Sequence, residues 1–358
     1  MRLCCTGATV NNNSTAATVD VLTQIWQRVL QRSPIGPEDK FSDLGGNDLI
    51  ADRMFAEIAQ VCGRELPSAT ICHASTIAAL AMLLDQPALP RFSPFVPLKA
   101  GSQNPPILIA HGVGGRASFS ELARHMRTSH PIYGIQAKGV DGMELPFDRI
   151  EDMAAFYLDA LEQLHLQDSC VLIGYSFGGL VALEMAQRLS EAGRRVALLV
   201  LVDTYPHPRY MAIGQRLWLF GRRVLGHLSS MAQMPIGRAF SYLADGIERR
   251  LHVAEAHRLR TLPPETSRLS FALTTSRNRE SDFLAMRRYR PRFYRGKIKF
   301  VRPASSSYLP TDPTAIWKNL AAELEVETVP GDHLGMIGTH FESLAAVLTR
   351  CVREAFSE

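Results

Sequence analysis

Apolar side chains recur at helical spacing in the first 85 residues. Three segments carry this pattern, at 19–29, 49–61 and 76–84. Apolar residues every three or four positions form one face of an α-helix, and capping or turn residues flank the first two segments. We therefore predict a small all-α bundle for residues 1–85.

After residue 97 the pattern changes to short apolar runs that alternate with helical segments. Short apolar runs are typical of buried strands, and several of the intervening stretches are long enough for crossover helices. The alternation predicts an α/β domain at 98–358, with a mostly parallel sheet covered on both faces. The expected strands are 107–110, 132–135, 171–173, 196–202, 298–301 and 324–329.

Two further segments interrupt these patterns. Four prolines in residues 87–97 prevent a regular helix and favour an extended chain, so we expect residues 86–97 to be a linker between domains. Residues 207–295 are helical in pattern, rich in arginine and placed between two expected strands. A long insertion at the carboxyl end of a sheet is typically a lid or binding element, so this segment is the expected helical lid.

The formal net charge of +4 conceals an uneven distribution. Residues 208–302 contain 18 Arg and 2 Lys but 6 acidic residues, a balance of +14, which leaves −10 for the rest of the chain. Clustered arginine attracts phosphates and acidic partners. The same arginines are equally consistent with solvated helices that pair with the acidic remainder. The basic segment carries no nucleic-acid-binding motif, so we expect no nucleic-acid partner.

Composition excludes several classes of protein. With 46% hydrophobic and 21% charged residues, the 358-residue chain is typical of a globular protein. Its longest aliphatic stretch, 196–202, is far shorter than the roughly 20 residues of a membrane helix, so no membrane association is expected. Residues 1–18 lack the apolar core of a secretory signal, which predicts a cytoplasmic protein. The six scattered cysteines lack metal-binding spacing, and we expect reduced thiols and no metal or other cofactor.

The sharpest chemical signal is a Gly-x-Ser-x-Gly motif, from Gly174 to Gly178, between an expected strand and an expected helix. Small residues around the serine allow a strained turn that lifts the hydroxyl of Ser176 above the sheet. The helix N-terminus behind it offers N–H groups to developing negative charge. This context predicts Ser176 as a nucleophile, whereas an unreactive serine there would only mark a tight turn.

A serine nucleophile needs a base, and the base needs an acid to orient it. Among eleven histidines, His333 follows the last expected strand in a loop with glycines, from which it can reach across the carboxyl edge of the sheet. We expect His333 to be the base, in keeping with the Ser, acid, His chain order of hydrolases with this motif. Two aspartates compete for the role of the acid: Asp203 directly follows strand 196–202, and Asp312 lies beyond strand 298–301.

Charge that develops on a carbonyl oxygen is stabilised by two N–H donors, which form an oxyanion hole. One donor is expected from Phe177, the residue after the nucleophile. The other is expected from the glycine-rich turn after strand 107–110, with Val113 preferred and Gly112 as the alternative. The turn lacks the Gly-Lys-Ser/Thr of a phosphate-binding loop.

Residues from about 97 onward resemble the thioesterase domains that end nonribosomal peptide and polyketide synthases, members of the α/β-hydrolase family. The matching pieces are Pro-Ile-Leu-Ile-Ala-His111-Gly-Val-Gly-Gly, Gly-Tyr-Ser176-Phe-Gly-Gly, Leu-Val-Leu-Val-Asp203 and Pro-Gly-Asp-His333. The resemblance implies an α/β-hydrolase fold with a helical lid. It also favours Asp203 as the acid, because in that family the acid follows the strand after the nucleophile's helix.

Residues 1–85 are similar to the acyl or peptidyl carrier domain that normally precedes such a thioesterase. Residues 41–50 align with a motif whose serine receives phosphopantetheine, but this chain has Asp48 at that position. A carboxylate has no hydroxyl to form the phosphodiester, and Ser42 in the preceding loop is a poor substitute. Asp48 is still a good helix start, since its side chain can accept backbone hydrogen bonds. The resemblance therefore implies a degenerate carrier domain with a docking or structural role.

Together these features predict a serine hydrolase of secondary-metabolite biosynthesis that hydrolyses or cyclises an acyl or peptidyl thioester through a Ser176 acyl-enzyme. The substrate is expected on the pantetheine arm of a carrier protein from another synthase subunit, on coenzyme A, or as a small ester. Two alternatives stay open. One is a carboxylesterase or acyltransferase with the same triad, and the other is a noncatalytic docking protein of a synthase.

Overall fold

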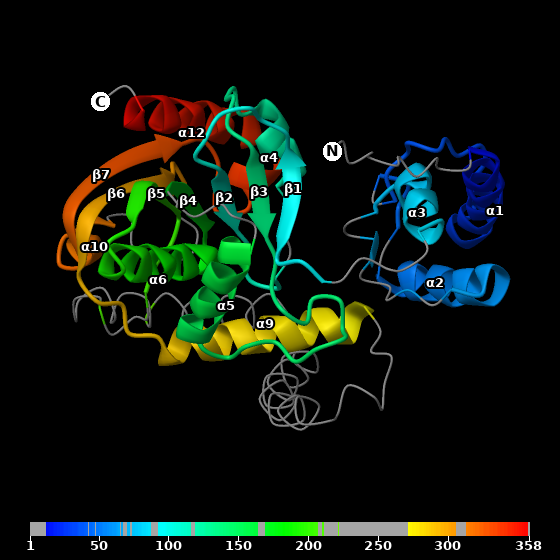
Figure 1. The fold of residues 1–358 in the computed structure, drawn as a ribbon, viewed down its shortest axis with the longest axis horizontal. Helices are drawn as coiled ribbons and strands as arrows, with labels where there is room; N and C mark the ends of the chain where they lie inside the picture. The colour runs from blue at the N-terminus through cyan, green and yellow to red at the C-terminus, as the bar shows by residue number, and fades with distance from the viewer. Residues whose placement is uncertain are drawn as a thin grey trace, which may run out of the picture. The chain divides into compact units, whose positions relative to one another are not determined.

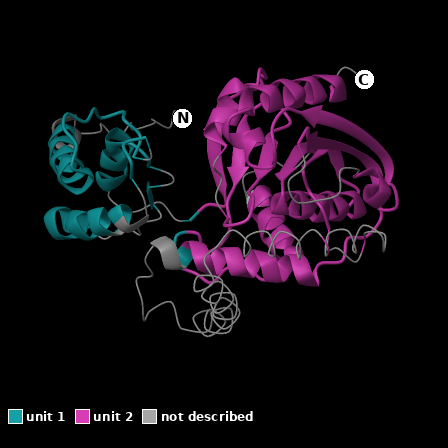
Figure 2. Ribbon diagram, turned by 180° about the vertical axis from the view of Figure 1, so that it is seen from behind, with its two compact units in different colours: residues 1–92, 141–143, 267–274 teal, residues 93–140, 144–266, 275–358 magenta. Residues whose placement is uncertain are grey.

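The computed structural model describes residues 12–41, 43–46, 48–64, 66, 70–71, 74–86, 92–115, 119–163, 169–206, 210, 221, 271–305 and 313–356. These residues form two compact units, coloured separately in Figure 2. The first comprises the described residues within 1–92, 141–143 and 267–274, and the second comprises the others. Within the described ranges, no helix is long and apolar enough to cross a membrane.

In the described residues of 12–86, three helices form a bundle (Figure 1). They are α1 (Asn12–Leu30), α2 (Asp48–Cys62) and α3 (Ile77–Leu84). Trp26, Met54 and Leu80, one from each helix, are fully buried in a shared apolar core. Thr76 caps α3 by accepting a hydrogen bond from the Ala79 N–H at 3.2 Å. The predicted helical bundle is confirmed, because the apolar faces found in the sequence are the faces that pack together.

The second unit contains a seven-stranded sheet in the order β1-β3-β2-β4-β5-β6-β7. The strands are β1 (Phe95–Lys99), β2 (Ile107–Ala110), β3 (Ile132–Ile135), β4 (Ser169–Tyr175), β5 (Arg195–Val202), β6 (Tyr294–Pro303) and β7 (Ala321–Val329). Neighbouring strands are parallel except for β1, which pairs antiparallel with β3. Ala110 pairs with Gly174, and Gly174 pairs with Leu201, so β2, β4 and β5 end at the same edge. All six predicted strands are present.

Side chains of the sheet alternate between two apolar cores, one on each face. Along β2, Ile107 and Ile109 belong to one core, while Leu108 and Ala110 belong to the other. This alternation follows from the two-residue period of a strand. The first face is covered by α4 (Ser120–His125) and α12 (Phe341–Ala355), and the second by α5 (Ile150–Gln163), α6 (Phe177–Glu191) and α9 (Phe271–Arg288) (Figure 1). The mostly parallel sheet with helices on both faces confirms the α/β fold class.

The structure differs from the sequence-based prediction at the start of the sheet. Residues 86–97 were expected to be linker, yet Phe95 pairs with Ile135 and Pro97 pairs with Tyr133 in the β1–β3 ladder. The linker prediction was therefore wrong for the last three residues of that segment. An edge strand tolerates proline because one side of it has no neighbouring strand, so a proline-rich run can still be a strand there.

Only part of the expected lid lies in the described ranges. Helix α9 forms the C-terminal part of the helical segment expected at 207–295, and β6 begins at Tyr294, within what had been assigned to the lid. The lid prediction for 207–209, 211–220 and 222–270 lies outside the described residues. Two short helices, α10 (Thr314–Trp317) and α11 (Gly335–Gly338), flank β7 in sequence.

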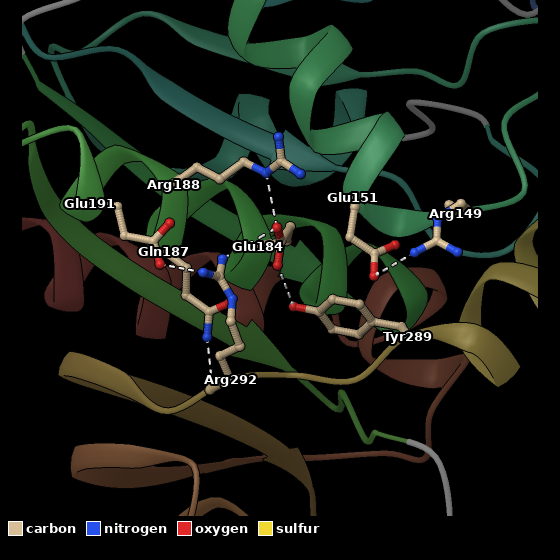
Figure 3. A network of polar contacts seen from close by, with 8 residues as sticks. All are labelled: Arg149, Glu151, Glu184, Gln187, Arg188, Glu191, Tyr289 and Arg292. Atoms are coloured by element: carbon tan, nitrogen blue, oxygen red, sulfur yellow. Dashed lines mark hydrogen bonds and ion pairs between the residues drawn. The ribbon is translucent and has the colours of Figure 1, made fainter.

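A buried carboxylate on α6 connects the sheet-covering helices to the chain after α9 (Figure 3). Glu184 accepts hydrogen bonds from Arg188 Nε at 2.9 Å and from the Tyr289 hydroxyl at 3.1 Å, and Arg292 Nη2 lies 3.4 Å from the same carboxylate. Gln187, one turn along α6, donates to the Arg292 backbone carbonyl at 2.6 Å. These bonds satisfy a charge that would otherwise be costly to bury, and they fix the end of α9 against α6.

Candidate active site

The Gly-x-Ser-x-Gly segment forms the sharp turn between β4 and α6. Ser176 has φ 55° and ψ −118°, a conformation that side-chain-bearing residues rarely adopt. Its N–H donates to the Val202 carbonyl at 2.8 Å, which anchors the turn to β5. The two flanking positions, Gly174 and Gly178, have no room for a side chain. A Cβ on Gly174 would lie 2.3 Å from the Gly179 Cα, and one on Gly178 would lie 2.2 Å from the His111 carbonyl oxygen.

Asp203 and His333 meet at the carboxyl edge of the sheet. The Nδ1 of His333 lies 2.6 Å from Oδ2 of Asp203, whose side chain is 8% exposed. A carboxylate can only accept, so Nδ1 carries the hydrogen, and in the neutral ring Nε2 is then the atom that accepts a proton. Asp203 itself has φ 44°, and its N–H donates to the Val301 carbonyl at 2.8 Å. Of the two aspartates expected to compete, Asp203 is next to His333, and Asp312 lies outside the described residues.

Tyr175, the variable residue before the serine, holds the loop of His333. The two rings stack with centroids 4.9 Å apart, and the Tyr175 hydroxyl donates to the His333 backbone carbonyl at 2.7 Å. Burial, followed by the negative charges of Asp203 and Asp332, raises the pKa of Tyr175, so the hydroxyl keeps the proton that it donates. Because Tyr175 and Ser176 are adjacent, this contact brings the histidine loop to the nucleophile turn.

The glycine-rich turn after β2 is shaped by close packing. Gly114 has φ +103° and Gly115 has φ +82°, and a Cβ on Gly115 would lie 2.6 Å from that of Ala137. Both positions therefore require glycine. In the part of the chain that the structure describes, the backbone N–H groups of Val113 and Phe177 have no hydrogen-bond partner. These are the two groups that the sequence predicts as oxyanion-hole donors.

A buried histidine at the start of this turn stabilises it through a hydrogen bond. His111 is 0% exposed, and its Nδ1 lies 2.8 Å from the Gly112 carbonyl oxygen, which can only accept. Burial lowers the pKa of His111 to about 4, partly offset by the bond to Gly112, so the ring is neutral at physiological pH. Nδ1 then carries the hydrogen, and Nε2 accepts from the Tyr157 hydroxyl at 3.2 Å. His111 fixes the turn and is not available as a base.

Two residues that support this turn, Tyr157 on α5 and Asp282 on α9, were not predicted from the sequence. Asp282 is 1% exposed and accepts a hydrogen bond from the Gly114 N–H at 2.8 Å. The one available signal was the helical spacing of polar residues in α9, and that pattern is equally typical of an ordinary solvent-exposed helix face. No group of three or more potential metal ligands occurs among the described residues.

Comparisons with known proteins identify the family of this chain. The family model described as "Thioesterase domain" matches residues 105–351. The chain belongs to the thioesterase domain family. A second model, described as "Phosphopantetheine attachment site", matches residues 20–84 of this thioesterase. These residues belong to the helical bundle. The expected arrangement of a carrier domain followed by a thioesterase domain is confirmed.

Relatives of the thioesterase are large synthases. It is 33% identical over 193 residues to a dimodular nonribosomal peptide synthase of Bacillus subtilis, which covers 52% of this chain and 8% of the relative. It is 31% identical over 199 residues to an indigoidine synthase of Streptomyces lavendulae, covering 55% of this chain and 15% of the relative. The chain thus spans a small fraction of the curated proteins that it matches.

One solved structure resembles the whole chain. A four-domain nonribosomal peptide synthetase, crystallised in its holo form with AMP and glycine, aligns with 98% of this chain and 27% of its own, at a TM-score of 0.56 and 21% identity. At that identity the likeness concerns the fold alone.

Proposed function

We propose that this thioesterase releases an acyl or peptidyl group from a phosphopantetheine thioester through a covalent Ser176 intermediate, in the cytoplasm and within the biosynthesis of a secondary metabolite. The observation that carries the proposal is the 2.6 Å contact between His333 and Asp203 beside the strained Ser176 turn. Membership of the thioesterase family supports the hydrolase activity, and the turn and the contact support its serine mechanism.

In the first half-reaction, the Ser176 oxygen attacks the thioester carbonyl while Nε2 of His333 takes its proton. The negative oxygen of the tetrahedral adduct accepts hydrogen bonds from the Val113 and Phe177 N–H groups, each worth about 3 kcal/mol in such sites. The C–S bond then breaks, and His333 returns the proton to the departing thiol. Asp203 holds the imidazole in the required tautomer and stabilises its protonated form.

In the second half-reaction, a nucleophile attacks the acyl-enzyme ester. Water gives a free acid, and a hydroxyl or amine within the acyl chain gives a ring. His333 again removes the proton from the nucleophile and returns it to the Ser176 oxygen. The scheme requires only the chain's own residues, the substrate and, for hydrolysis, water.

The donor of the acyl group is proposed to be a carrier protein of another synthase subunit, or coenzyme A. Helix α2 begins at Asp48, the position at which the attachment serine of a carrier is expected. An aspartate cannot accept phosphopantetheine through a phosphodiester, so the domain preceding the thioesterase is proposed to dock and not to carry the substrate. The basic stretch 208–302 supports an acidic or phosphate-bearing donor.

A fluorophosphonate probe tests the nucleophile. The full chain is incubated with the probe, digested and mapped by mass spectrometry, with Ser176→Ala as the control. We expect one adduct, on the peptide that contains Ser176, and no adduct on the control. A folded wild-type protein that stays unlabelled would favour a noncatalytic docking role.

Matched substrates test the reaction class. An acyl-pantetheine thioester and the corresponding oxygen ester differ only in the leaving atom. We expect a higher kcat/KM for the thioester. Preference for the oxygen ester would identify a carboxylesterase that uses the same residues.

A further inference from the structure

Helix α9, yellow in Figure 1, buries a polar face. A helix that covers a sheet normally buries an apolar stripe, and buried polar side chains need specific partners. Five polar residues of α9 recur at helical spacing, and none is more than 8% exposed: Thr274, Arg277, Asn278, Ser281 and Asp282. Two of these side chains make hydrogen bonds to loops after the strands: Asn278 Nδ2 donates to the Gly139 carbonyl at 3.0 Å, and Asp282 accepts from the Gly114 N–H.

Asp282 makes its bond to a residue far away in the sequence. Its Oδ2 accepts from the Gly114 N–H at 2.8 Å, although the two residues are 168 positions apart. Burial raises the pKa of Asp282 well above its usual range, and the Gly114 N–H opposes that shift. A neutral carboxylic acid still accepts through its carbonyl oxygen, so the bond does not require a negative charge.

The contact determines the direction of a neighbouring N–H group. The peptide between Gly112 and Val113 is planar, so its C=O and N–H point in opposite directions. Its carbonyl is fixed by His111 Nδ1 at 2.8 Å. The next peptide, between Val113 and Gly114, is fixed through its N–H by Asp282. With both peptide planes held, the Val113 N–H has one direction available.

We propose that Asp282 is a positioning residue for the oxyanion hole: its carboxyl holds the Gly114 N–H so that the Val113 N–H stays aimed at the developing oxyanion. Efficient acyl transfer then requires α9 to be docked on the turn after β2. This inference rests on the proposed roles of Ser176 and Val113, and it adds the condition that a helix of the expected lid segment completes the site.

Three variants of the full chain separate positioning from packing. Asp282→Asn keeps an acceptor oxygen in nearly the same volume. Asp282→Leu keeps the volume and removes the acceptor. Ser281→Ala changes an equally buried neighbour on the same helix, whose hydroxyl has no hydrogen-bond partner among the described residues. Turnover of an acyl-pantetheine thioester gives kcat and KM, and the rate of fluorophosphonate labelling reports the same N–H donors independently.

We expect Asp282→Leu to lower kcat about 10- to 100-fold with KM within about threefold of wild type, less than the complete loss of an oxyanion donor. The labelling rate should fall in parallel. The kcat of Asp282→Asn should stay within about threefold of wild type. The kcat of Ser281→Ala should equal that of wild type. If the leucine variant does not fold, Asp282→Ala provides the second acceptor-free form, and the asparagine variant still tests the acceptor.

Other outcomes overturn the inference. A folded acceptor-free variant with wild-type kcat would show that the Gly114 bond is not needed, and an asparagine variant as slow as the leucine variant would show that the acceptor alone is not enough. An equal loss in Ser281→Ala would assign the effect to helix packing, and a change confined to KM would assign it to substrate binding. A wild-type protein that is not labelled at Ser176 overturns the proposed function instead.

Discussion

The ring of Tyr175 stacks on the imidazole of His333, and its hydroxyl donates to the backbone carbonyl of the same histidine at 2.7 Å. The variable position of the Gly-x-Ser-x-Gly motif thus holds the loop of the proposed base. A displacement of the histidine loop would break both contacts, so the nucleophile turn and the base loop are held as one piece.

Replacing Tyr175 tests this coupling. Tyr175→Phe removes the hydrogen bond and keeps the stacked ring, so we expect kcat to fall by about 3- to 10-fold, in line with the loss of one buried hydrogen bond. Tyr175→Leu also removes the ring and should cost more. Steady-state kinetics at several pH values measure the effect. Wild-type kcat in both variants, with the fold intact by circular dichroism, would contradict the coupling.

The acid is tested by comparing two aspartates. Asp203→Asn should lower kcat by roughly a thousand- to ten-thousand-fold, because the amide can donate to Nδ1 and so favour the tautomer whose Nε2 cannot accept the proton of Ser176. Asp312→Asn is the matched control and should leave kcat unchanged. Equal activity of the Asp203 variant and the wild type would exclude Asp203 as the acid, and a large loss in the control would point to Asp312.

The sequence predicts most of the sheet because central strands such as β2 and β4 are buried on both faces and appear as continuous apolar runs. Strand β1 was missed because Pro94 and Pro97 suggested a linker, and only the pairing with β3 identifies an edge strand. The choice of Asp203 rested on a resemblance, and the contact with His333 adds a geometric reason. Asp282 could not have been found, since a bond across 168 residues depends on how α9 docks and not on a local pattern.

Burial of His111 predicts a pH-dependent stability. In the unfolded chain its imidazole is protonated below about pH 6.5, whereas in the folded protein its pKa is lowered to about 4. The unfolded state therefore binds more protons between these values, and stability is lost as the pH falls through this window. Asp282, whose pKa is raised, binds its proton more tightly in the folded state and opposes the trend. The contribution of His111 must therefore be measured as the difference in the free energy of unfolding between wild type and a variant of His111.

The comparison is between wild type and His111→Asn, whose amide can donate to Gly112 but does not titrate. We expect the stability of wild type relative to the variant to fall by about 3 kcal/mol between pH 6.5 and pH 4. Urea unfolding, followed by hydrogen exchange of peptides from β4 and β5, isolates the sheet from the helical bundle. Parallel pH curves for the two proteins would rule out a buried neutral imidazole.

The last prediction concerns Asp48 and the way in which substrate reaches the site. With coenzyme A and a broad-specificity phosphopantetheinyl transferase, the wild-type chain should gain no mass, because a carboxylate at the start of α2 cannot form the phosphodiester. Asp48→Ser introduces a hydroxyl at the position where the resemblance to carrier domains places the attachment serine, and this variant should gain one phosphopantetheine group. Asp48→Ala is the control for non-specific modification. Intact mass spectrometry measures the mass of all three proteins, and peptide mapping locates any adduct.

Modification of the wild-type chain, at Ser42 or elsewhere in residues 20–84, would mean that the domain carries its own substrate. The proposal of a separate donor would then be withdrawn.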